Sequence, residues 1–167
     1  MSPILTTKGK FMIAGRTTRS RSFAIFLVML VAAVTLVMAA SSSGAAGNTE
    51  ARGDGRAYPD RTCEQLGFAG PTNYKLDNAG GYVQVFFSSA KDANCLQTIN
   101  STSIARRTHI YLARSGTGMD YALDFGTYRS YAGAVVLLNA GGHCIDFSGY
   151  VDYRGGSEVN VRKAHCG

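Results

Sequence analysis

The 167-residue sequence has no tryptophan, only three prolines and only three histidines. His109, His143 and His165 are too far apart in sequence to form the local pairs that are typical of metal ligands. No two of the four cysteines have the close spacing that zinc sites favour. These absences exclude the common short metal-binding motifs, and we expect no metal or other cofactor.

Motifs of catalysis are also missing. The sequence has no G-x-S-x-G nucleophile motif, and pairing of all four cysteines would leave no thiolate nucleophile. Asp124, Asp146 and Asp152 have the residue type of a glycosidase pair. Aspartates at alternating strand positions are, however, typical of a solvated sheet face. We therefore expect a protein that is not an enzyme.

Acidic residues are absent from the first 40 residues, which hold five of the 17 Lys and Arg residues. The rest of the chain contains the other basic residues and all 11 acidic residues, so its net charge is only +1. A surface with so little net charge does not strongly attract phosphates. We expect no nucleic-acid partner.

The N-terminal segment has the three parts of a secretory signal peptide. Three arginines between residues 16 and 21 precede an uncharged apolar run of 15 residues at 23–37, and small residues follow at 39–47. This run is shorter than the roughly 20 residues of a membrane-spanning helix. We expect residues 1–40 to be a signal peptide, cleaved after Ala39, Ala40 or Ala46, and the protein to be secreted. The alternative is an uncleaved leader that anchors the chain in the membrane.

All four cysteines follow this leader. In an exported protein, an even number of cysteines in a small domain predicts two disulfides. We expect Cys63–Cys166, which would tie the two ends of the domain together, and Cys95–Cys144, which would join the starts of two strands. In the chain-entropy description each bridge stabilises the fold by about 4–5 kcal/mol.

Residues 41–57 are rich in Ser, Gly and Ala and predict a flexible linker in front of a β domain at 58–167. This linker contains Arg52-Gly53-Asp54, an integrin-binding tripeptide to which we assign no role. Within the domain, residues 59–66 predict at most one short helical turn that ends at Gly67.

The domain otherwise consists of short β-branched and aromatic stretches at about ten-residue spacing, separated by turn residues. The expected strands are 82–88, 94–102, 108–113, 124–131, 134–139, 144–153 and 158–162. Residues 134–139 are apolar on both faces and predict a central, buried strand. The expected fold class is all-β: a small antiparallel β-sandwich or barrel of about seven strands, stapled by two disulfides.

Nine tyrosines follow the leader. Tyrosine combines an apolar ring with a polar hydroxyl, so an exposed cluster would suit sugar rings or a protein partner. The alternative is that the tyrosines fill half-buried sheet positions, where they are favoured anyway. Tyr128, Tyr131 and Tyr150 are the candidates for an exposed, ligand-facing group.

Two regions of the domain are distinctive: GYVQVFFSSAKDANC at 81–95, and DFGTYRSYAGAV at 124–135 followed by AGGHC at 140–144. With the four cysteines in order, they resemble the spore-associated protein A family of small exported actinobacterial proteins. The sequence departs from that family at Ala134, in place of a proline, and at Phe147, in place of a tryptophan. The resemblance implies association with spores or the aerial cell surface and no known catalytic activity.

These features together predict a non-enzymatic secreted protein associated with the spore or cell surface, with a structural or adhesive role. Its partner would be a cell-wall or spore-surface polymer or protein. Two alternatives stay open. A polysaccharide- or cell-wall-binding module would need an exposed face lined by tyrosines. A secreted protease inhibitor would need an exposed, rigid loop beside a disulfide, such as 113–120 (ARSGTGMD).

Overall fold

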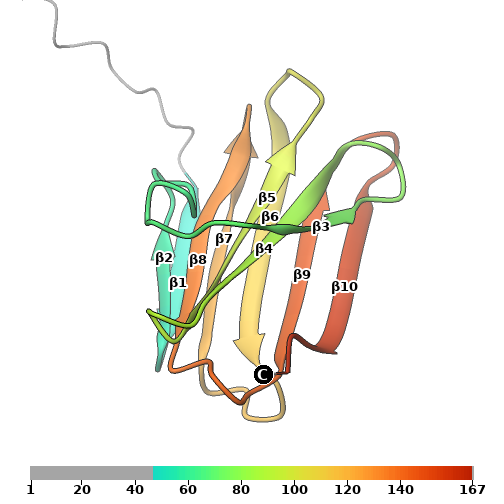
Figure 1. The fold of residues 1–167 in the computed structure, drawn as a ribbon. Helices are drawn as coiled ribbons and strands as arrows, with labels where there is room; N and C mark the ends of the chain where they lie inside the picture. The colour runs from blue at the N-terminus through green and yellow to red at the C-terminus, as the bar shows by residue number, and fades with distance from the viewer. Residues whose placement is uncertain (1–46, 167) are drawn as a thin grey trace, which may run out of the picture. The chain divides into compact units, whose positions relative to one another are not determined.

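The computed structural model describes residues 47–166, so the expected signal peptide at 1–40 lies outside the described residues. Residues 47–166 form ten β-strands and no helix, and accordingly none that could cross a membrane. The strands make two antiparallel sheets of five strands each, which pack face to face (Figure 1). The expected all-β sandwich is confirmed. Its strand count of about seven is too low, and the two sheets do not close into a barrel.

Sheet A and sheet B each have a simple strand order. Sheet A runs β1 (Asn48–Arg52), β7 (Tyr121–Tyr128), β6 (Arg106–Arg114), β9 (Ile145–Val151) and β10 (Ser157–Ala164). Sheet B runs β2 (Gly55–Tyr58), β8 (Tyr131–Leu138), β5 (Ala93–Asn100), β4 (Gly81–Ser88) and β3 (Thr72–Lys75). Every neighbouring pair is antiparallel.

The main core lies between the two sheets because alternate residues of each strand point inward. Burial of these apolar side chains supplies the main driving force for folding, at about 25 cal/mol per Å² removed from water. The buried cluster consists of Val83, Val85, Leu96, Ile110, Leu112, Ala122, Ala132, Val135, Leu137, Ile145 and Phe147.

Three strands were not expected from the sequence. β1 and all but the last residue of β2 lie inside the stretch 41–57 that predicts a flexible linker, so strands replace the expected linker in residues 48–52 and 55–57, whereas residues 41–46 lie outside the described residues. Every residue of β1 is exposed, and such an edge strand needs no apolar alternation. β3 is also short and mostly exposed.

One expected strand is two strands in the structure. The chain turns at Arg129 and Ser130, so that β7 ends at Tyr128 and β8 begins at Tyr131. The expected strand at 124–131 therefore spans a corner at which the chain leaves sheet A and enters sheet B.

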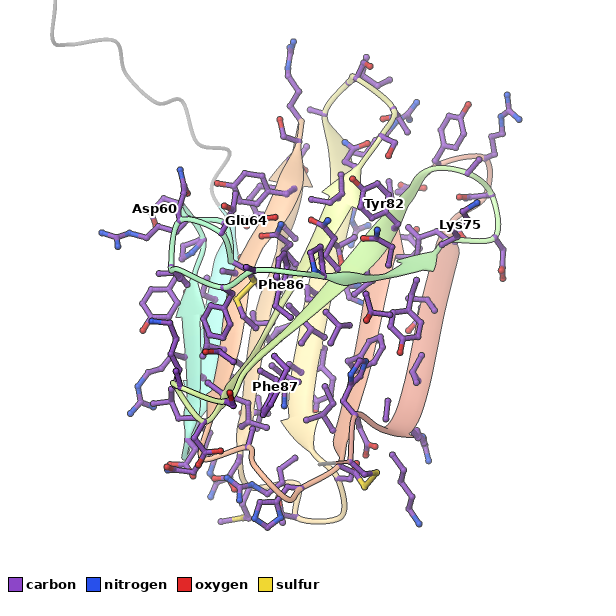
Figure 2. The ribbon with its side chains drawn as sticks, in the orientation of Figure 1. Asp60, Glu64, Lys75, Tyr82, Phe86 and Phe87 are labelled. Atoms are coloured by element: carbon purple, nitrogen blue, oxygen red, sulfur yellow. A yellow bond between two sulfur atoms is a disulfide. The ribbon has the colours of Figure 1, made fainter. Side chains whose placement is uncertain are left out.

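The connection from β2 to β3, residues 59–71, crosses the outer face of sheet B from one edge strand to the other (Figure 1). Phe68 and Cys63 on this connection form a second small core with residues of β4, β5 and β8, among them Phe86 and Val136 (Figure 2). This cover explains why β8 is apolar on both faces, and it confirms β8 as a buried central strand.

The expected helical turn at 59–66 is a series of turns rather than a helix. Thr62 and Gln65 hydrogen-bond each other reciprocally, with backbone N–H to side-chain oxygen distances of 2.8 and 3.2 Å. This is the pattern of a capping box. The turn ends at Gly67, whose φ of 80° is readily adopted only by glycine.

The two disulfides are Cys63–Cys95 and Cys144–Cys166. The expected pairing of Cys63 with Cys166 and of Cys95 with Cys144 is therefore wrong. The crossing connection brings Cys63 over β5, where Cys95 is located. Cys144 precedes β9 and Cys166 follows its neighbour β10, so the second bridge joins the adjacent ends of two paired strands.

Candidate functional site

The outward side chains of sheet A form a surface that we call the A face. It includes aromatic residues of β6, β7 and β9. These alternate along each strand with residues whose side chains are buried between the sheets. Phe125 on β7 is 43% exposed. His109 on β6 and Tyr150 on β9 are half-buried.

Three of these rings form a row across the strands. The register places His109 directly opposite Phe125 on one side and Tyr150 on the other. Because neighbouring strands lie about 4.8 Å apart, the three residues occupy adjacent positions on the face. The rings of His109 and Tyr150 are stacked, with centroids 5.5 Å apart and an interplanar angle of 15°. The stacked pair His109–Tyr150 therefore forms the fixed part of this aromatic row.

A hollow of about 230 Å³ opens at this row. This volume is below the range of about 300–1,000 Å³ that encloses a drug-sized ligand. It suits one ring of a larger molecule that lies over the face. The hollow is lined by Arg107, Thr108, His109, Phe125, Gly126, Thr127 and Tyr150.

A second aromatic pair extends the A face along the strands. Tyr111 on β6 and Tyr121 on β7 have ring centroids 6.2 Å apart. The hydroxyl of Tyr121 donates a hydrogen bond to the Glu50 carboxylate on β1, and this bond raises the pKa of Tyr121. The A face thus offers five rings, of which the imidazole and the three phenols carry polar groups.

The surroundings of His109 favour its neutral form. Burial lowers the pKa of His109, and the nearby Glu158 carboxylate offsets only part of that effect. The Nε2 atom of His109 lies 3.4 Å from the Ser148 hydroxyl. Among residues 47–166 no carboxylate hydrogen-bonds this imidazole, so the pair lacks the third group that orients a catalytic triad. A neutral imidazole of this kind can donate and accept hydrogen bonds to a ligand.

Charges of both signs surround these rings. Arg52 and Arg107 lie at positions of the A face whose strand partners are Tyr121 and Thr127. Glu50 and Glu158 lie opposite Leu123 and Tyr150. The face therefore has no strong field of one sign, consistent with the low net charge of the chain beyond the leader.

The three tyrosines predicted as a ligand-facing group do not lie together. Tyr150 belongs to the A face and lines its hollow. Tyr131 lies on β8 of sheet B. Tyr128 packs against the main core and donates a hydrogen bond to Asp124. The sequence analysis missed Phe125 and His109 as partners of Tyr150, although strand alternation places both on outward positions.

The three aspartates do not form a glycosidase-like pair. Asp124 is fully buried between the sheets, whereas Asp146 lies on the opposite side of sheet A, where its carboxylate accepts a hydrogen bond from Ser115 at 2.6 Å. Asp152 follows the end of β9 and is half-buried. Two of the three therefore lie on opposite sides of one sheet.

The remaining histidines flank the second disulfide. The Nε2 atom of His165 lies 3.0 Å from the hydroxyl of Tyr74 on β3, and His143 is exposed in the loop before Cys144. In the part of the chain that the structure describes, no three His, Cys, Asp or Glu residues are placed to hold a metal ion.

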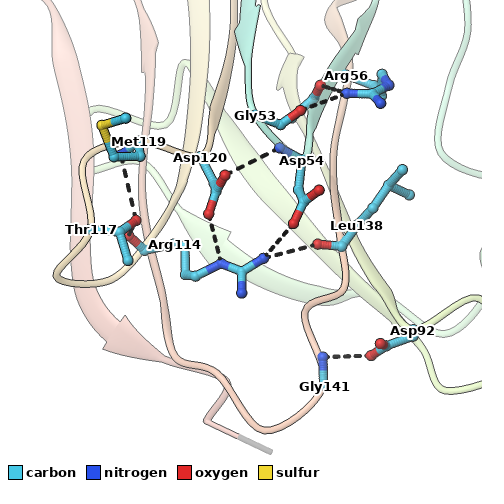
Figure 3. A network of polar contacts seen from close by, with 11 residues as sticks. Gly53, Asp54, Arg56, Asp92, Arg114, Thr117, Met119, Asp120, Leu138 and Gly141 are labelled. Carbon is cyan, nitrogen blue, oxygen red and sulfur yellow. Dashed lines mark hydrogen bonds and ion pairs between the residues drawn. The ribbon is translucent and has the colours of Figure 1, made fainter.

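The loop between β6 and β7 is anchored at its base by Arg114 (Figure 3). The Arg114 guanidinium pairs with Asp54 at 2.9 Å and with Asp120 at 3.1 Å. Asp54 of the Arg-Gly-Asp tripeptide is thus ion-paired with Arg114, although its side chain is still 37% exposed. The loop also lies beside a disulfide, because the Ser115 N–H donates to the Cys144 carbonyl at 3.0 Å.

Comparison with known proteins adds no family to this description: no protein-family model, curated protein or solved structure matches the chain. The resemblance to the spore-associated protein A family stays a prediction.

Proposed function

We propose that this chain is an exported, non-catalytic protein that binds a polysaccharide of the cell or spore surface through the A face. The observation that carries the proposal is the row Phe125–His109–Tyr150, which places three rings side by side on the open side of a five-stranded sheet. The role is adhesive: the domain would be retained at the surface after export.

The chemistry of the row suits a sugar chain. The apolar faces of pyranose rings pack on aromatic rings, and sugar hydroxyls need hydrogen-bond partners at the ring edges. Arg107, Ser148 and the neutral His109 supply such partners around the hollow. Because the aromatic groups extend over several strands, the face favours a polymer over a small free ligand.

Other binding partners have less support. Nucleic acid is disfavoured because Arg52 and Arg107 are offset by Glu50 and Glu158 on the same face. For the protease-inhibitor alternative, the loop between β6 and β7 does lie beside a disulfide, as that function would need. However, Gly116 and Gly118 in that loop both have positive φ, 82° and 58°, so the loop curls instead of presenting the extended segment that pairs with a sheet edge.

Retention on insoluble polysaccharide tests the proposal. The secreted protein is incubated with purified peptidoglycan and, separately, with chitin, and the bound fraction is measured across a concentration series. Replacement Phe125→Ala should weaken binding about tenfold or more, as expected for loss of an aromatic hot spot. Phe87→Ala on β4 of sheet B is the matched control, because Phe87 is similarly exposed, at 46%; binding by this variant should stay unchanged.

Failure is equally clear in this design. If wild-type protein is not retained on either polymer, or if the two Phe→Ala variants lose the same amount of binding, the A face is not a glycan site. A protease panel run in parallel tests the inhibitor alternative, and inhibition abolished by shortening loop 115–119 would replace the proposed function.

A further inference from the structure

Asp124 is a fully buried carboxylate in the core of the sandwich. One oxygen accepts a hydrogen bond from the Tyr128 hydroxyl at 2.7 Å, and the other accepts from the Gly133 N–H at 2.6 Å. Both donors are neutral. The ion pairs within residues 47–166 all involve Arg114 and not Asp124. Burial accordingly raises the pKa of Asp124, although the two hydrogen bonds oppose this effect. A buried carboxylate of this kind gains from a cationic partner.

Gly47, the residue before β1, lies close to this carboxylate. Gly47 packs closely against Gly126 of β7. If Gly126 carried a Cβ atom, that atom would lie only 2.7 Å from the Cα of Gly47. A Cβ on Gly47 would collide with the Tyr128 hydroxyl and would lie 3.3 Å from Asp124 Oδ1. The amino nitrogen of Gly47 is two bonds from that Cβ position, so it lies within about 6 Å of the carboxylate.

Ala46-Gly47 is also one of the three cleavage positions that the leader allows. Gly44 and Ala46 are small residues at the third and first positions before this bond. Cleavage after Ala39 or Ala40 would instead leave the new terminus six or seven residues ahead of Gly47, with no cationic side chain in between.

We propose that the leader is removed between Ala46 and Gly47, and that the new α-ammonium group of Gly47 pairs with the buried carboxylate of Asp124. Water hydrolyses the Ala46–Gly47 peptide bond: the carbonyl becomes the carboxylate of Ala46, and the released amine takes up a proton as the ammonium of Gly47. The freed terminus is no longer held by residue 46, so the ammonium can approach the carboxylate beside the Tyr128 hydroxyl, which already contacts Asp124. Removal of the leader thereby supplies a cationic partner for the buried Asp124 carboxylate.

This inference depends on export of the chain and not on glycan binding, so the two proposals fail separately. It also assigns a reason for glycine at position 47. Any side chain there would occupy the space of the Tyr128 hydroxyl, which hydrogen-bonds Asp124.

The first test is the N-terminus of the secreted protein. The full-length gene is expressed in a secreting bacterial host, and the mature chain is identified by intact mass and N-terminal sequencing. A chain that starts at Gly47 is expected. A start at any residue from 40 to 46, or an uncleaved chain, overturns the proposal.

The second test measures the reactivity of the Gly47 amine toward an amine-acylating reagent across pH. An ordinary α-amino group has a pKa of about 7.7–8.0, and pairing with a carboxylate raises it by a unit or more. Acylation at neutral pH should therefore be at least about tenfold slower than in an unstructured peptide with the same terminus. The ionisable groups near Asp124 are Tyr128 and Tyr131, and both are neutral over this pH range.

Variants locate the effect. Asp124→Asn should restore rapid acylation, whereas Tyr131→Phe should leave it slow. If Asp124→Asn does not fold, the comparison is made between folded and denaturant-unfolded wild-type protein, in which the slow rate should be lost. Equal rates in the folded protein and the peptide would contradict the ion pair.

Discussion

The Tyr128 hydroxyl donates a hydrogen bond to the Asp124 carboxylate four residues earlier on the same strand, at 2.7 Å. The second oxygen of that carboxylate accepts from the Gly133 N–H on β8. Asp124 therefore links sheet A to sheet B from inside the core. Burial, and then the hydrogen bond to Asp124, raise the pKa of Tyr128, so its hydroxyl stays a donor at all ordinary pH values.

Replacement Tyr128→Phe should destabilise the protein by about 1–3 kcal/mol, because a buried carboxylate oxygen loses its donor. Denaturant unfolding monitored by fluorescence or circular dichroism measures the difference. Tyr131→Phe is the control, since no side-chain hydrogen bond is assigned to the Tyr131 hydroxyl. Equal stability of Tyr128→Phe and wild type would show that the bond adds nothing to the fold.

Ser115→Ala should give a stability loss that depends on pH. Burial alone would raise the pKa of Asp146, but hydrogen bonds from the Ser115 hydroxyl and the Lys163 N–H, with nearby Arg162, lower it below its ordinary value. A carboxyl with a lowered pKa stabilises the fold at neutral pH, and this contribution is lost as the pH falls through its folded-state pKa.

Thermal unfolding of wild type and Ser115→Ala at several pH values measures this effect. The variant should unfold at a lower temperature at neutral pH, and the gap should close in acid below the ordinary carboxyl range. A gap of constant size from neutral pH to acid would mean that Ser115 acts only by packing. Thr117→Ala, in the same loop but without contact to Asp146, serves as the control.

The disulfide pairing gives a chemical test of the fold. Proteolysis without reduction, followed by mass spectrometry, should identify linked peptides for Cys63–Cys95 and Cys144–Cys166. The two bridges separate their cysteines by 32 and 22 residues. In the chain-entropy description their removal by paired Cys→Ala replacement costs about 4 and 3 kcal/mol, respectively. A peptide linking Cys63 to Cys166 would contradict the crossing of residues 59–71 over sheet B.

Much of the fold could be predicted from local pattern. Alternation in 82–88 and 108–113 identifies β4 and β6 because alternate residues of each strand meet the main core, although Phe86 of β4 also belongs to the second core. The apolar run at 134–139 identifies β8 because it is covered on both sides. Edge strands do not show such patterns: β1 is exposed along its whole length, so Ser and Gly around it were interpreted as a linker.

The disulfides and the A face depend on topology that no local pattern contains. Cys63 reaches Cys95 only because the β2–β3 connection passes over β5. Phe125, His109 and Tyr150 become neighbours only because β6 lies between β7 and β9. Choosing tyrosines alone, without the strand order, selected residues from both sheets.

The strand order also makes the two sides of the sandwich unequal. On one side the chain passes directly between the sheets twice, from β1 to β2 and from β7 to β8. On the other side, β3 and β10 are far apart in sequence and meet through side chains, among them Tyr74 and His165. At the β3–β10 side, side-chain contacts rather than a direct chain connection therefore hold the two edge strands together. Transient exposure of the core is expected at that side, away from the buried carboxylate of Asp124.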